Sequence, residues 1–466
     1  MSRSVAPPPP ATTGTTIGDR LDRLPIVASH RTLTLLIGVG LFFDYFDSNL
    51  SGTVSRVLQT EFGIGGTTLM LFLASGFIGQ FFGSIFLGRF SDVVGRRRAF
   101  MINLAVYSVF TLLGAFSPNA AWLILTRFLA GVGIGAEQTL ADCYLTEVLP
   151  ARRRGRFIAW AYSLAFCGVP AVGFTALWLA PRDFLGLAGW RWVFIIGALG
   201  TAFIWILRRR LVESPRWLAE QGRQVEADAV VRRFEQEAGI QSPAVTVDVT
   251  VTVRRPRYAS LFSPRYWRRT VALWTFCLLS VTAYYGFGTL APQVLAVKGF
   301  DVVQGLSFTA LSFLGYPVGS LLSVPIMDRV ERRTLICVSA ALMAFSGLCF
   351  GFAGSVTVVV VAGFSYTLMS NLFSTASHVY LAEQYPTAFR TTAAGAAYAL
   401  SRLSAALLPF LLLPVLTGYG AGWLFTIIAT CVAVMIGVVL MLGARTTGTS
   451  ADLPYGDDEP TRVGRT

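Results

Sequence analysis

The chain has 466 residues, of which 54% are hydrophobic and only 14% charged, and its mean hydropathy is +0.60. Soluble globular proteins carry about 25% charged residues, so this composition excludes that class and indicates a polytopic membrane protein. The net charge of +13 does not indicate a nucleic-acid partner, because the arginines lie in short segments between apolar stretches and not on one basic face.

The two ends of the chain and its cysteines carry little information about function. The six cysteines lie within or at the ends of apolar stretches, and no two have C-x-x-C spacing, so neither disulfide bonds nor a metal site is predicted. Residues 1–31 hold a run of four prolines and no apolar stretch. We expect them to form a disordered cytoplasmic tail, and not a signal peptide.

Apolar stretches fill most of the chain. With about 20 residues for each membrane span, they predict twelve transmembrane helices in two sets of six. The first set forms a bundle over 32–209, with helices near 32–56, 67–89, 98–117, 121–143, 156–181 and 189–209. The second forms a bundle over 270–444, with helices near 270–292, 304–327, 334–353, 357–382, 392–416 and 421–444. The polar residues 445–466 are expected to be a second disordered tail.

Residues 210–269 form a charged linker between the two sets. Ser214 and Pro215 can start a helix, and the run to Glu237 is amphipathic enough to lie along the membrane face. Gly239 is expected to end this helix. The linker is either a plain tether between two bundles or a segment with a regulatory or gating role.

Arginine is distributed unevenly among the predicted connections. The even-numbered connections hold most of it: Arg89, Arg96 to Arg98, Arg152 to Arg154, Arg156, Arg329, Arg332, Arg333 and Arg390. The others hold little beyond Arg56, Arg182, Arg191 and Lys298. Because positively charged loops stay on the cytoplasmic side, we expect both termini and the linker to be cytoplasmic in a multi-pass protein of the plasma (inner) membrane.

The two sets carry the same motifs at a constant offset of 236 residues. Tyr144-Leu145-x-Glu147-x-x-Pro150-x-x-x-Arg154 recurs as Tyr380-Leu381-x-Glu383-x-x-Pro386-x-x-x-Arg390. The same offset maps Phe77, Gly79, Gly83 and Ser84 onto Phe313, Gly315, Gly319 and Ser320, and Asp92, Arg96 and Arg97 onto Asp328, Arg332 and Arg333. Matching charges at fixed spacing indicate an internal duplication. The predicted fold is an all-α membrane protein of two pseudo-symmetric six-helix bundles.

Two motifs resemble those of the major facilitator superfamily of transporters. Gly88-x-x-x-Asp92-x-x-Gly95-Arg96-Arg97 resembles the family's loop motif between helices 2 and 3, and Arg127-x-x-x-Gly131-x-Gly133-x-Gly135 resembles its helix 4 motif. The family usually has a basic residue where this chain has Val93, so we expect part of that charge network to be rewired. The resemblance implies the major facilitator fold and a transporter that functions as a monomer.

Other motifs resemble two groups within this superfamily. Three are similar to the sugar-porter and organic-ion group: Glu147-x-x-Pro150-x-x-x-Arg154-Gly155, Trp190-Arg191 and Glu213-Ser214-Pro215-Arg216-Trp217-Leu218. Three look more like the metabolite:proton and aromatic-acid:proton symporters: Leu21-Asp22-Arg23-Leu24-Pro25, Phe43-Asp44-Tyr45-Phe46-Asp47 and Tyr284-Tyr285-Gly286.

Asp92 lies at a predicted helix end with Arg96 four residues later, and the repeat places Asp328 and Arg332 in the same relation. A carboxylate–guanidinium contact of this kind can form in one conformation and break in another. We therefore predict a conformational latch, the alternative being that these charges only set topology and solubility. The other residues assigned to it are Gly88, Gly95, Arg97, Glu147, Arg154, Glu383 and Arg390.

Asp44 and Asp47 lie three residues apart near the middle of the first span. Two carboxylates at that depth cannot both be ionised cheaply, which predicts a proton site. The resemblance implies that Asp47 accepts the proton and communicates with Arg127, whereas the alternative is a purely structural ion pair. Glu137 lies ten residues after Arg127, on about the same face of the helix. It is predicted to belong to the substrate cavity or to be a second protonatable group.

In the second half, Arg402 lies deep in a predicted span and needs a counter-charge. An anionic substrate would supply it, and the alternative is a neighbouring helix or backbone carbonyls. His378 is a further candidate for substrate contact, although a packing role is the simpler interpretation. Tyr284, Tyr285 and Gln293 suit an aromatic or partly apolar solute.

These observations predict a proton-coupled symporter that imports a small organic or aromatic acid by alternating access. It would need no cofactor beyond the proton gradient, and its partners would be the solute, protons and the lipid bilayer. No Walker A loop, HExxH motif or nucleophile–base pair indicates an enzyme. The alternatives are an antiporter that exports drugs or metabolites, which Gly168-x-Pro170-x-x-Gly173 faintly resembles, and a non-transporting sensor.

Overall fold

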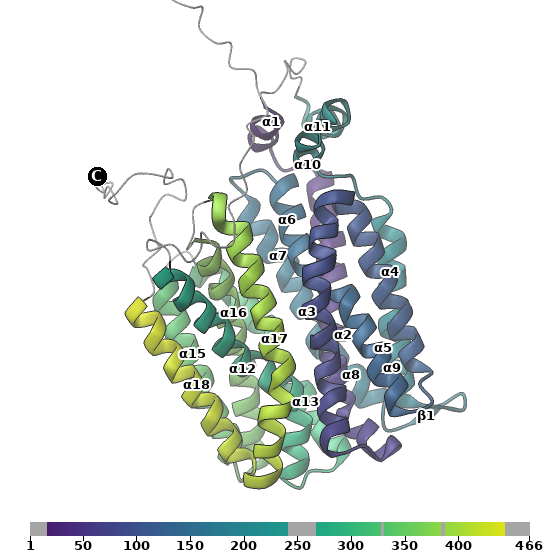
Figure 1. The fold of residues 1–466 in the computed structure, drawn as a ribbon, viewed down its shortest axis with the longest axis vertical. Helices are drawn as coiled ribbons and strands as arrows, with labels where there is room; N and C mark the ends of the chain where they lie inside the picture. The colour runs from purple at the N-terminus through teal and green to yellow at the C-terminus, as the bar shows by residue number, and fades with distance from the viewer. Residues whose placement is uncertain (1–15, 241–266, 328–329, 384–386, 443–466) are drawn as a thin grey trace, which may run out of the picture.

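The computed structural model describes residues 16–240, 267–327, 330–383 and 387–442. Within them, twelve helical stretches are long and apolar enough to cross a membrane, as predicted. They form two bundles side by side, the first in purple to blue and the second in green to yellow (Figure 1). Three short helices lie together at one end, which we call the linker end: α1 (Ile17–Arg23), α10 (Pro215–Glu220) and α11 (Gln224–Ala238). The opposite end is the far end.

The first bundle contains six spans. Its helices are α2 (Ala28–Phe62), α3 (Gly66–Val94), α4 (Arg96–Ala115), α5 (Ala120–Ile134), α6 (Glu137–Val148), α7 (Arg154–Phe166), α8 (Gly168–Leu179) and α9 (Gly189–Arg208). The fourth span consists of α5 and α6, and the fifth of α7 and α8. A hairpin of β1 (Asp183–Phe184) and β2 (Leu187–Ala188) precedes α9 at the far end.

The second bundle also contains six spans, of which the second consists of α13 and α14. Its helices are α12 (Trp267–Val297), α13 (Val302–Phe313), α14 (Gly315–Met327), α15 (Arg332–Phe352), α16 (Val356–Glu383), α17 (Thr387–Tyr419) and α18 (Ala421–Leu442). Large apolar side chains on the outside of the molecule, such as Phe203 and Leu411, are 59% and 64% exposed. Such surfaces suit contact with lipid.

The duplication extends to the closest helix contacts. A Cβ on Gly79 would lie 2.0 Å from the backbone oxygen of Phe128, and a Cβ on Gly315 would lie 2.4 Å from that of Phe364. Both members of the second pair follow those of the first by 236 residues. Glycine therefore lets α3 approach α5, and α14 approach α16, closely at equivalent positions.

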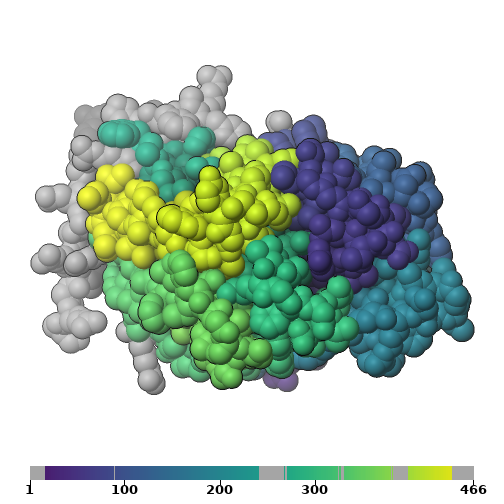
Figure 2. Space-filling view, turned by 90° about the horizontal axis from the view of Figure 1, so that it is seen from below, coloured from purple at the N-terminus to yellow at the C-terminus, as the bar shows by residue number. Residues whose placement is uncertain are grey.

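The main contacts between the two bundles pair α2 with α12, α3 with α17, α8 with α13 and α7 with α14. Gln293 on α12 donates a hydrogen bond of 3.1 Å to Ser55 on α2, and Ser163 on α7 shares one of 2.9 Å with Ser320 on α14. Figure 2 views the far end and shows the atoms of the two halves meeting along a continuous seam. The polar residues between the bundles are thus covered from this side.

Helix α1 is held against α11 by charge pairs. Arg20, which is 4% exposed, donates to both carboxylate oxygens of Glu235, at 2.8 and 2.7 Å, and to Asp228 at 2.6 Å. Thr16 and Asp19 form a reciprocal capping box at the start of α1, and its hydrogen bonds lower the pKa of Asp19. The prediction of a disordered tail over 1–31 is therefore wrong for residues 16–31, because these ion pairs order the segment. Residues 1–15 and 445–466 lie outside the described residues.

The linker contains two helices where one was predicted. Gly222, with φ of +75°, turns the chain between α10 and α11. The apolar side of α11 is buried through Ala227, Val231 and Phe234, and the Phe234 ring lies 4.8 Å from that of His30 on α2. The face that was predicted to lie along the membrane is therefore covered by protein.

Candidate functional site

Asp47 on α2 and Arg127 on α5 form a bidentate ion pair inside the first bundle. Arg127 Nη1 donates to Asp47 Oδ1 at 3.0 Å, and Nη2 donates to Oδ2 at 2.8 Å and to the backbone oxygen of Asp47 at 3.0 Å. Thr111 on α4 also donates to Oδ1, at 3.0 Å. Asp47 is 1% exposed and Arg127 2% exposed. Protonation of Asp47 would remove the charge that holds the buried guanidinium in place.

Asp44 lies one turn before Asp47 and is equally buried, but its Oδ1 has no hydrogen-bond partner among the described residues. The charged groups that interact with it electrostatically are Glu137, Arg402, Asp47 and Arg208. A buried carboxylate with an unpaired oxygen is costly to leave ionised. Asp44 is therefore suited to hold a proton or to accept a hydrogen bond from a solute.

Glu137, the first residue of α6, forms an ion pair with Arg208, the last residue of α9, and neither side chain is exposed. Arg208 also donates to the backbone oxygen of Ile37 at 3.3 Å, and its guanidinium lies 4.5 Å from the centre of the Phe100 ring. Glu137 Oε2 has no hydrogen-bond partner in the part of the chain that the structure describes. A second acid–base pair is thus enclosed in the first bundle, nearer the linker end than Asp47.

Arg402 on α17 is 7% exposed and has neutral hydrogen-bond partners. It donates to the Tyr285 hydroxyl on α12 at 2.5 Å and to the side-chain oxygen of Gln138 on α6. The contact with Gln138 joins the two bundles. Among the described residues no carboxylate forms an ion pair with Arg402, so this buried cation is available to an anion.

Aromatic rings adjoin Arg402. Its guanidinium lies 5.6 Å from the centre of the Tyr285 ring, and Tyr285 lies edge to face with Phe77 of α3 at 5.0 Å and with Tyr284 at 4.9 Å. Tyr284 is 6.0 Å from Tyr316 of α14. This group draws rings from both bundles and would favour a flat, apolar part of a solute. The other residue predicted on this helix, Gln293, instead joins α12 to α2 through Ser55.

A small hollow lies beside Arg127, lined by Ser48, Ser51 and Gln80 of the first bundle and Thr289 of the second. Three polar atoms of its lining residues, Ser51 Oγ, Gln80 Oε1 and Arg127 Nε, are buried without a hydrogen-bond partner among the described residues. Buried polar atoms in proteins are nearly always paired. Three unpaired ones around one hollow therefore make it a position that can bind a small polar group.

His378 lies at the interface between the bundles. It bonds through Nδ1 with the Tyr398 hydroxyl on α17, and its ring centre is 5.7 Å from that of Tyr162 on α7. Tyr162 donates to Asp142 at 2.7 Å. His378 thus contacts the first bundle through the Tyr162 ring, apart from the hydrogen bonds of Arg402.

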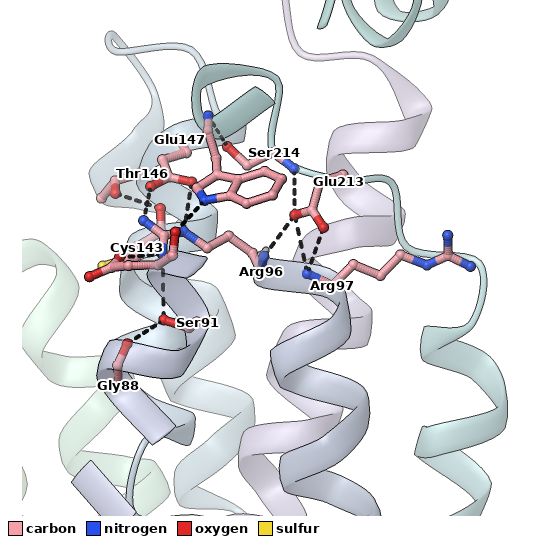
Figure 3. Close-up of polar contacts among 11 residues, drawn as sticks. Gly88, Ser91, Arg96, Arg97, Cys143, Thr146, Glu147, Glu213 and Ser214 are labelled. Carbon is pink, nitrogen blue, oxygen red and sulfur yellow. Dashed lines mark hydrogen bonds and ion pairs between the residues drawn. The ribbon is translucent and has the colours of Figure 1, made fainter. Parts of the chain in front are cut away.

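The predicted contact between Asp92 and Arg96 is present at the linker end. Arg96 Nη1 donates to Asp92 at 2.6 Å, and Nη2 donates to Glu147 at 2.9 Å (Figure 3). Gly88 lies one turn away and accepts a hydrogen bond of 2.7 Å from Ser91. Arg96 therefore ties together α3, α4 and α6 in one cluster.

Glu213, in the loop after α9, caps this cluster. Its carboxylate accepts hydrogen bonds from the backbone nitrogen of Arg96 at 2.8 Å and from that of Arg97 at 3.2 and 3.3 Å (Figure 3). A carboxylate is favourable at the start of a helix. Gly95 has φ of +103°, and a Cβ there would lie 2.5 Å from Glu213 Oε2, so only glycine fits.

The other residues assigned to the latch are placed differently. Arg154 does not bind Glu147 but donates to the backbone oxygen of Leu149 at 3.4 Å and pairs with Asp22 at 3.5 Å. Arg97 donates to the backbone oxygen of Arg209 at 2.6 Å. In the second half Arg332 begins α15. Asp328 and the side chains of Glu383 and Arg390 lie outside the described residues.

Three contacts of the site were not predicted from the sequence. Arg208 begins a run of three arginines, so it resembles the charges that set topology at other helix ends. A buried Glu137 needs a cation, and this need was the signal that could have identified Arg208 as its partner. Glu213 and Gln138 gave no comparable signal, because their partners lie 117 and 264 residues away. Among the described residues no group of three or more His, Cys, Asp or Glu side chains could hold a metal ion.

The sequence from residue 36 to 452 matches the family model described as "Sugar (and other) transporter". This match includes both bundles and the linker. The chain belongs to this family. It is therefore a multi-pass membrane transporter of the major facilitator superfamily, as the two motifs and the twelve spans predicted.

The transporter is similar to two curated relatives over most of its length. It is 28% identical to the niacin transporter NiaP of Acinetobacter baylyi (strain ATCC 33305 / BD413 / ADP1), with 92% of this chain and 97% of that one covered. It is also 28% identical to the gallate transporter of Pseudomonas putida, with 82% and 85% covered. The relatives are transporters of small molecules, and none of these names describes an enzyme.

A solved structure shares the fold. The transporter superposes on a partially occluded inward-open conformation of the xylose transporter XylE from E. coli with a TM-score of 0.72, covering 91% of this chain and 100% of that one. The two sequences are 19% identical, so this likeness concerns the fold alone. It confirms the predicted architecture of two six-helix bundles.

Proposed function

We propose that this transporter is a symporter that couples the import of a small organic acid, in particular an aromatic one, to the entry of protons by alternating access. The observation that carries the proposal is a pair of complementary buried charges. Asp47 is an acid whose only cationic partner among the described residues is Arg127, and Arg402 is a cation without an acidic one. The first can take up a proton and the second an anion.

Proton uptake would act through the Asp47 and Arg127 pair. A neutral Asp47 no longer offsets the charge of Arg127, so the tie between α2 and α5 weakens. Both helices border the hollow that also contacts α12, so a change in this pair can shift the balance between conformations of the two bundles. Asp44 and Glu137 are the other acids in this region that could carry the proton.

The choice of an aromatic acid rests on Arg402 and its surroundings. A carboxylate would form a charge-assisted contact with the guanidinium, while Tyr284, Tyr285 and Phe77 would pack on a ring. The names of the two relatives agree with this choice, because niacin and gallate are both aromatic carboxylic acids.

We further propose that the linker end faces the cytoplasm in the plasma membrane, as the arginine distribution predicts. On this orientation the far end and the β1–β2 hairpin face outward. The transporter would act as a monomer and would use the proton gradient without a cofactor.

The test is uptake into proteoliposomes with and without an inward proton gradient. The substrates are matched acids and amides: niacin and nicotinamide, benzoate and benzamide, with xylose as a neutral solute. We expect accumulation of an acid that requires the gradient and is abolished by a protonophore. Outward movement of the solute against the proton flow would instead show an antiporter, and binding without movement would show a sensor.

A further inference from the structure

Arg127 faces two environments. Its two Nη atoms hold Asp47, whereas the residue also borders the hollow, and its Nε lacks a partner in the described part of the chain. Two oxygens on the other lining residues, Ser51 Oγ and Gln80 Oε1, are also unpartnered there, and these side chains are 7% and 2% exposed. The amide nitrogen of Gln80 is oriented by a weak hydrogen bond of 3.4 Å to Ser48.

Unpaired buried acceptors are expensive. Each costs about 1–3 kcal/mol in lost solvation. Both acceptors lie beside Arg127, whose two Nη atoms are held by Asp47, and a second state in which the guanidinium turns toward the hollow would satisfy them. That state requires Arg127 to be released from Asp47.

We propose that the hollow is the second docking position of the Arg127 guanidinium, occupied when Asp47 carries a proton, and that Gln80 and Ser51 are its positioning residues. This inference rests on the proposed function, because it assumes that protons are taken up at Asp47. A proton joins one carboxylate oxygen of Asp47, which becomes a neutral acid. Arg127 keeps its own proton and charge and moves its donors to Gln80 Oε1 and Ser51 Oγ.

The location of the hollow gives this movement a consequence for transport. Thr289 of α12 lines the hollow, and one turn further along α12 Gln293 bonds to Ser55 of α2. A guanidinium that moves into the hollow therefore enters the contact between α2 and α12. Protonation inside the first bundle would in this way reach the seam between the halves.

Other titratable groups surround the pair but do not line the hollow. Asp44 lies on α2, Glu137 on α6, Arg208 on α9, Arg402 on α17 and Tyr107 on α4. The Phe194 ring of α9 lies 5.7 Å from the Arg127 guanidinium and bears no charge. A substitution at Gln80 therefore changes the acceptors for Arg127 without removing any of these charges.

The experiment measures, in proteoliposomes, the external pH at which gradient-driven uptake of an acid is half-maximal. Gln80→Leu removes the acceptor, so the state in which Arg127 is released loses one hydrogen bond to a charged group. Half-maximal uptake should then need about a tenfold higher proton concentration, which is a midpoint about one pH unit lower. Gln80→Glu provides a carboxylate in the hollow and should shift the midpoint in the opposite direction, to higher pH. A carboxylate near Asp47 also favours its protonation by charge repulsion, so the shift to lower pH in Gln80→Leu and Ser51→Ala is the signature of competition for Arg127.

A matched serine pair controls for packing. Ser51→Ala should shift the midpoint in the same direction as Gln80→Leu, by a smaller amount. Ser75→Ala removes an equally buried hydroxyl, which is already bonded to the backbone oxygen of Phe72 at 2.8 Å, and should leave the midpoint unchanged. Substrate counterflow at fixed pH confirms that each variant is folded, and if Gln80→Leu fails this check, Ser51→Ala and Gln80→Glu provide the test.

The outcomes separate the two proposals. If wild-type uptake does not depend on the gradient, the symport proposal fails and this inference fails with it. If wild-type uptake is gradient-driven but the Gln80 variants keep the wild-type midpoint, or both shift it in one direction, only the second docking position is rejected. A raised KM with an unchanged midpoint would assign Gln80 to the substrate and also reject it.

Discussion

Glu137 and Arg208 join the start of α6 to the end of α9 through an ion pair without exposed surface. Glu137 follows the break in the fourth span, so the pair fixes the second part of that span against the sixth. The next residue, Gln138, accepts a hydrogen bond from Arg402 of the other bundle. The position of this contact between the halves therefore depends on a charge pair one residue away.

Removing one member of this pair should destabilise the protein more than removing both. Arg208→Leu leaves a buried carboxylate without a cation and should lower the free energy of unfolding by about 3–5 kcal/mol. The double variant Glu137→Gln, Arg208→Leu should recover part of that loss. Thermal unfolding in detergent measures the change, with Arg223→Gln as the control, because its pair with Glu226 is exposed and should have no measurable effect. Equal losses in the single and double variants would contradict the prediction.

Asp47→Asn should abolish gradient-driven accumulation and retain counterflow. The amide keeps the size of the side chain and can still accept from Thr111, but it has no proton to exchange. Net uptake with an imposed gradient and exchange without one are measured on the same vesicles. Thr111→Val, which removes the neutral partner and keeps the carboxylate, is the control and should preserve accumulation. Full accumulation by Asp47→Asn would transfer the role to Asp44 or Glu137.

Arg402→Gln should weaken the binding of an acid about 10–100-fold and that of its amide much less, because a charge-assisted hydrogen bond to the carboxylate is lost. Arg402→Lys should restore only part of the affinity, since an ammonium group cannot donate two parallel hydrogen bonds to a carboxylate as a planar guanidinium can. Binding of niacin and nicotinamide to purified protein provides the comparison. Equal weakening of both ligands would assign Arg402 to the structural contact with Gln138 and Tyr285.

Glu147→Gln should loosen the cluster around Arg96. The loss of one charged partner, worth about 1.5–3 kcal/mol, should increase opening at the linker end by about tenfold or more. Cys143, which lies one turn before Glu147 on α6, is a natural reporter in a variant without the other five cysteines. Its alkylation rate should rise in Glu147→Gln and stay unchanged in Arg223→Gln. An unchanged rate in both would leave these charges with a role in topology alone.

The proposed orientation can be tested at two exposed positions on opposite ends. Glu226→Cys lies on α11 at the linker end, and Leu185→Cys lies in the β1–β2 hairpin at the far end, where Leu185 is 90% exposed. An impermeant thiol reagent added to intact cells should label the second and not the first. Labelling in the reverse pattern would invert the proposed topology.

The fold was predictable because the sequence features that indicate it are either local, such as apolar stretches, or repeated in both halves. Twelve apolar stretches of sufficient length define the spans, and the 236-residue offset defines the two bundles. The same offset identifies Gly79 and Gly315 as positions of close helix approach. Asp92 and Arg96 were predictable as a contact because they lie one turn apart on adjoining helix ends.

The pairings between distant helices could not be predicted in the same way. Nothing in the sequence relates Arg20 to Glu235. Because this pair could not be foreseen, residues 16–31 were wrongly predicted to be disordered. Likewise, the resemblance implied that Asp47 communicates with Arg127, but only the structure shows that both carboxylate oxygens of Asp47 are bound and that Asp44 Oδ1 is left unpaired among the described residues. Which side chains pair between helices depends on how each helix is rotated about its axis, and that rotation depends on the packing of the whole bundle.

The contact between α1 and α11 has a consequence for the order of assembly during synthesis. Arg20 precedes all six spans of the first bundle and therefore leaves the ribosome before them, but its partners Asp228 and Glu235 follow more than 200 residues later, after those spans. Helix α1 can therefore dock only on a first bundle whose polypeptide is complete. Because domains generally fold as units from the N-terminus, this docking would close the first bundle before most of the second has been made.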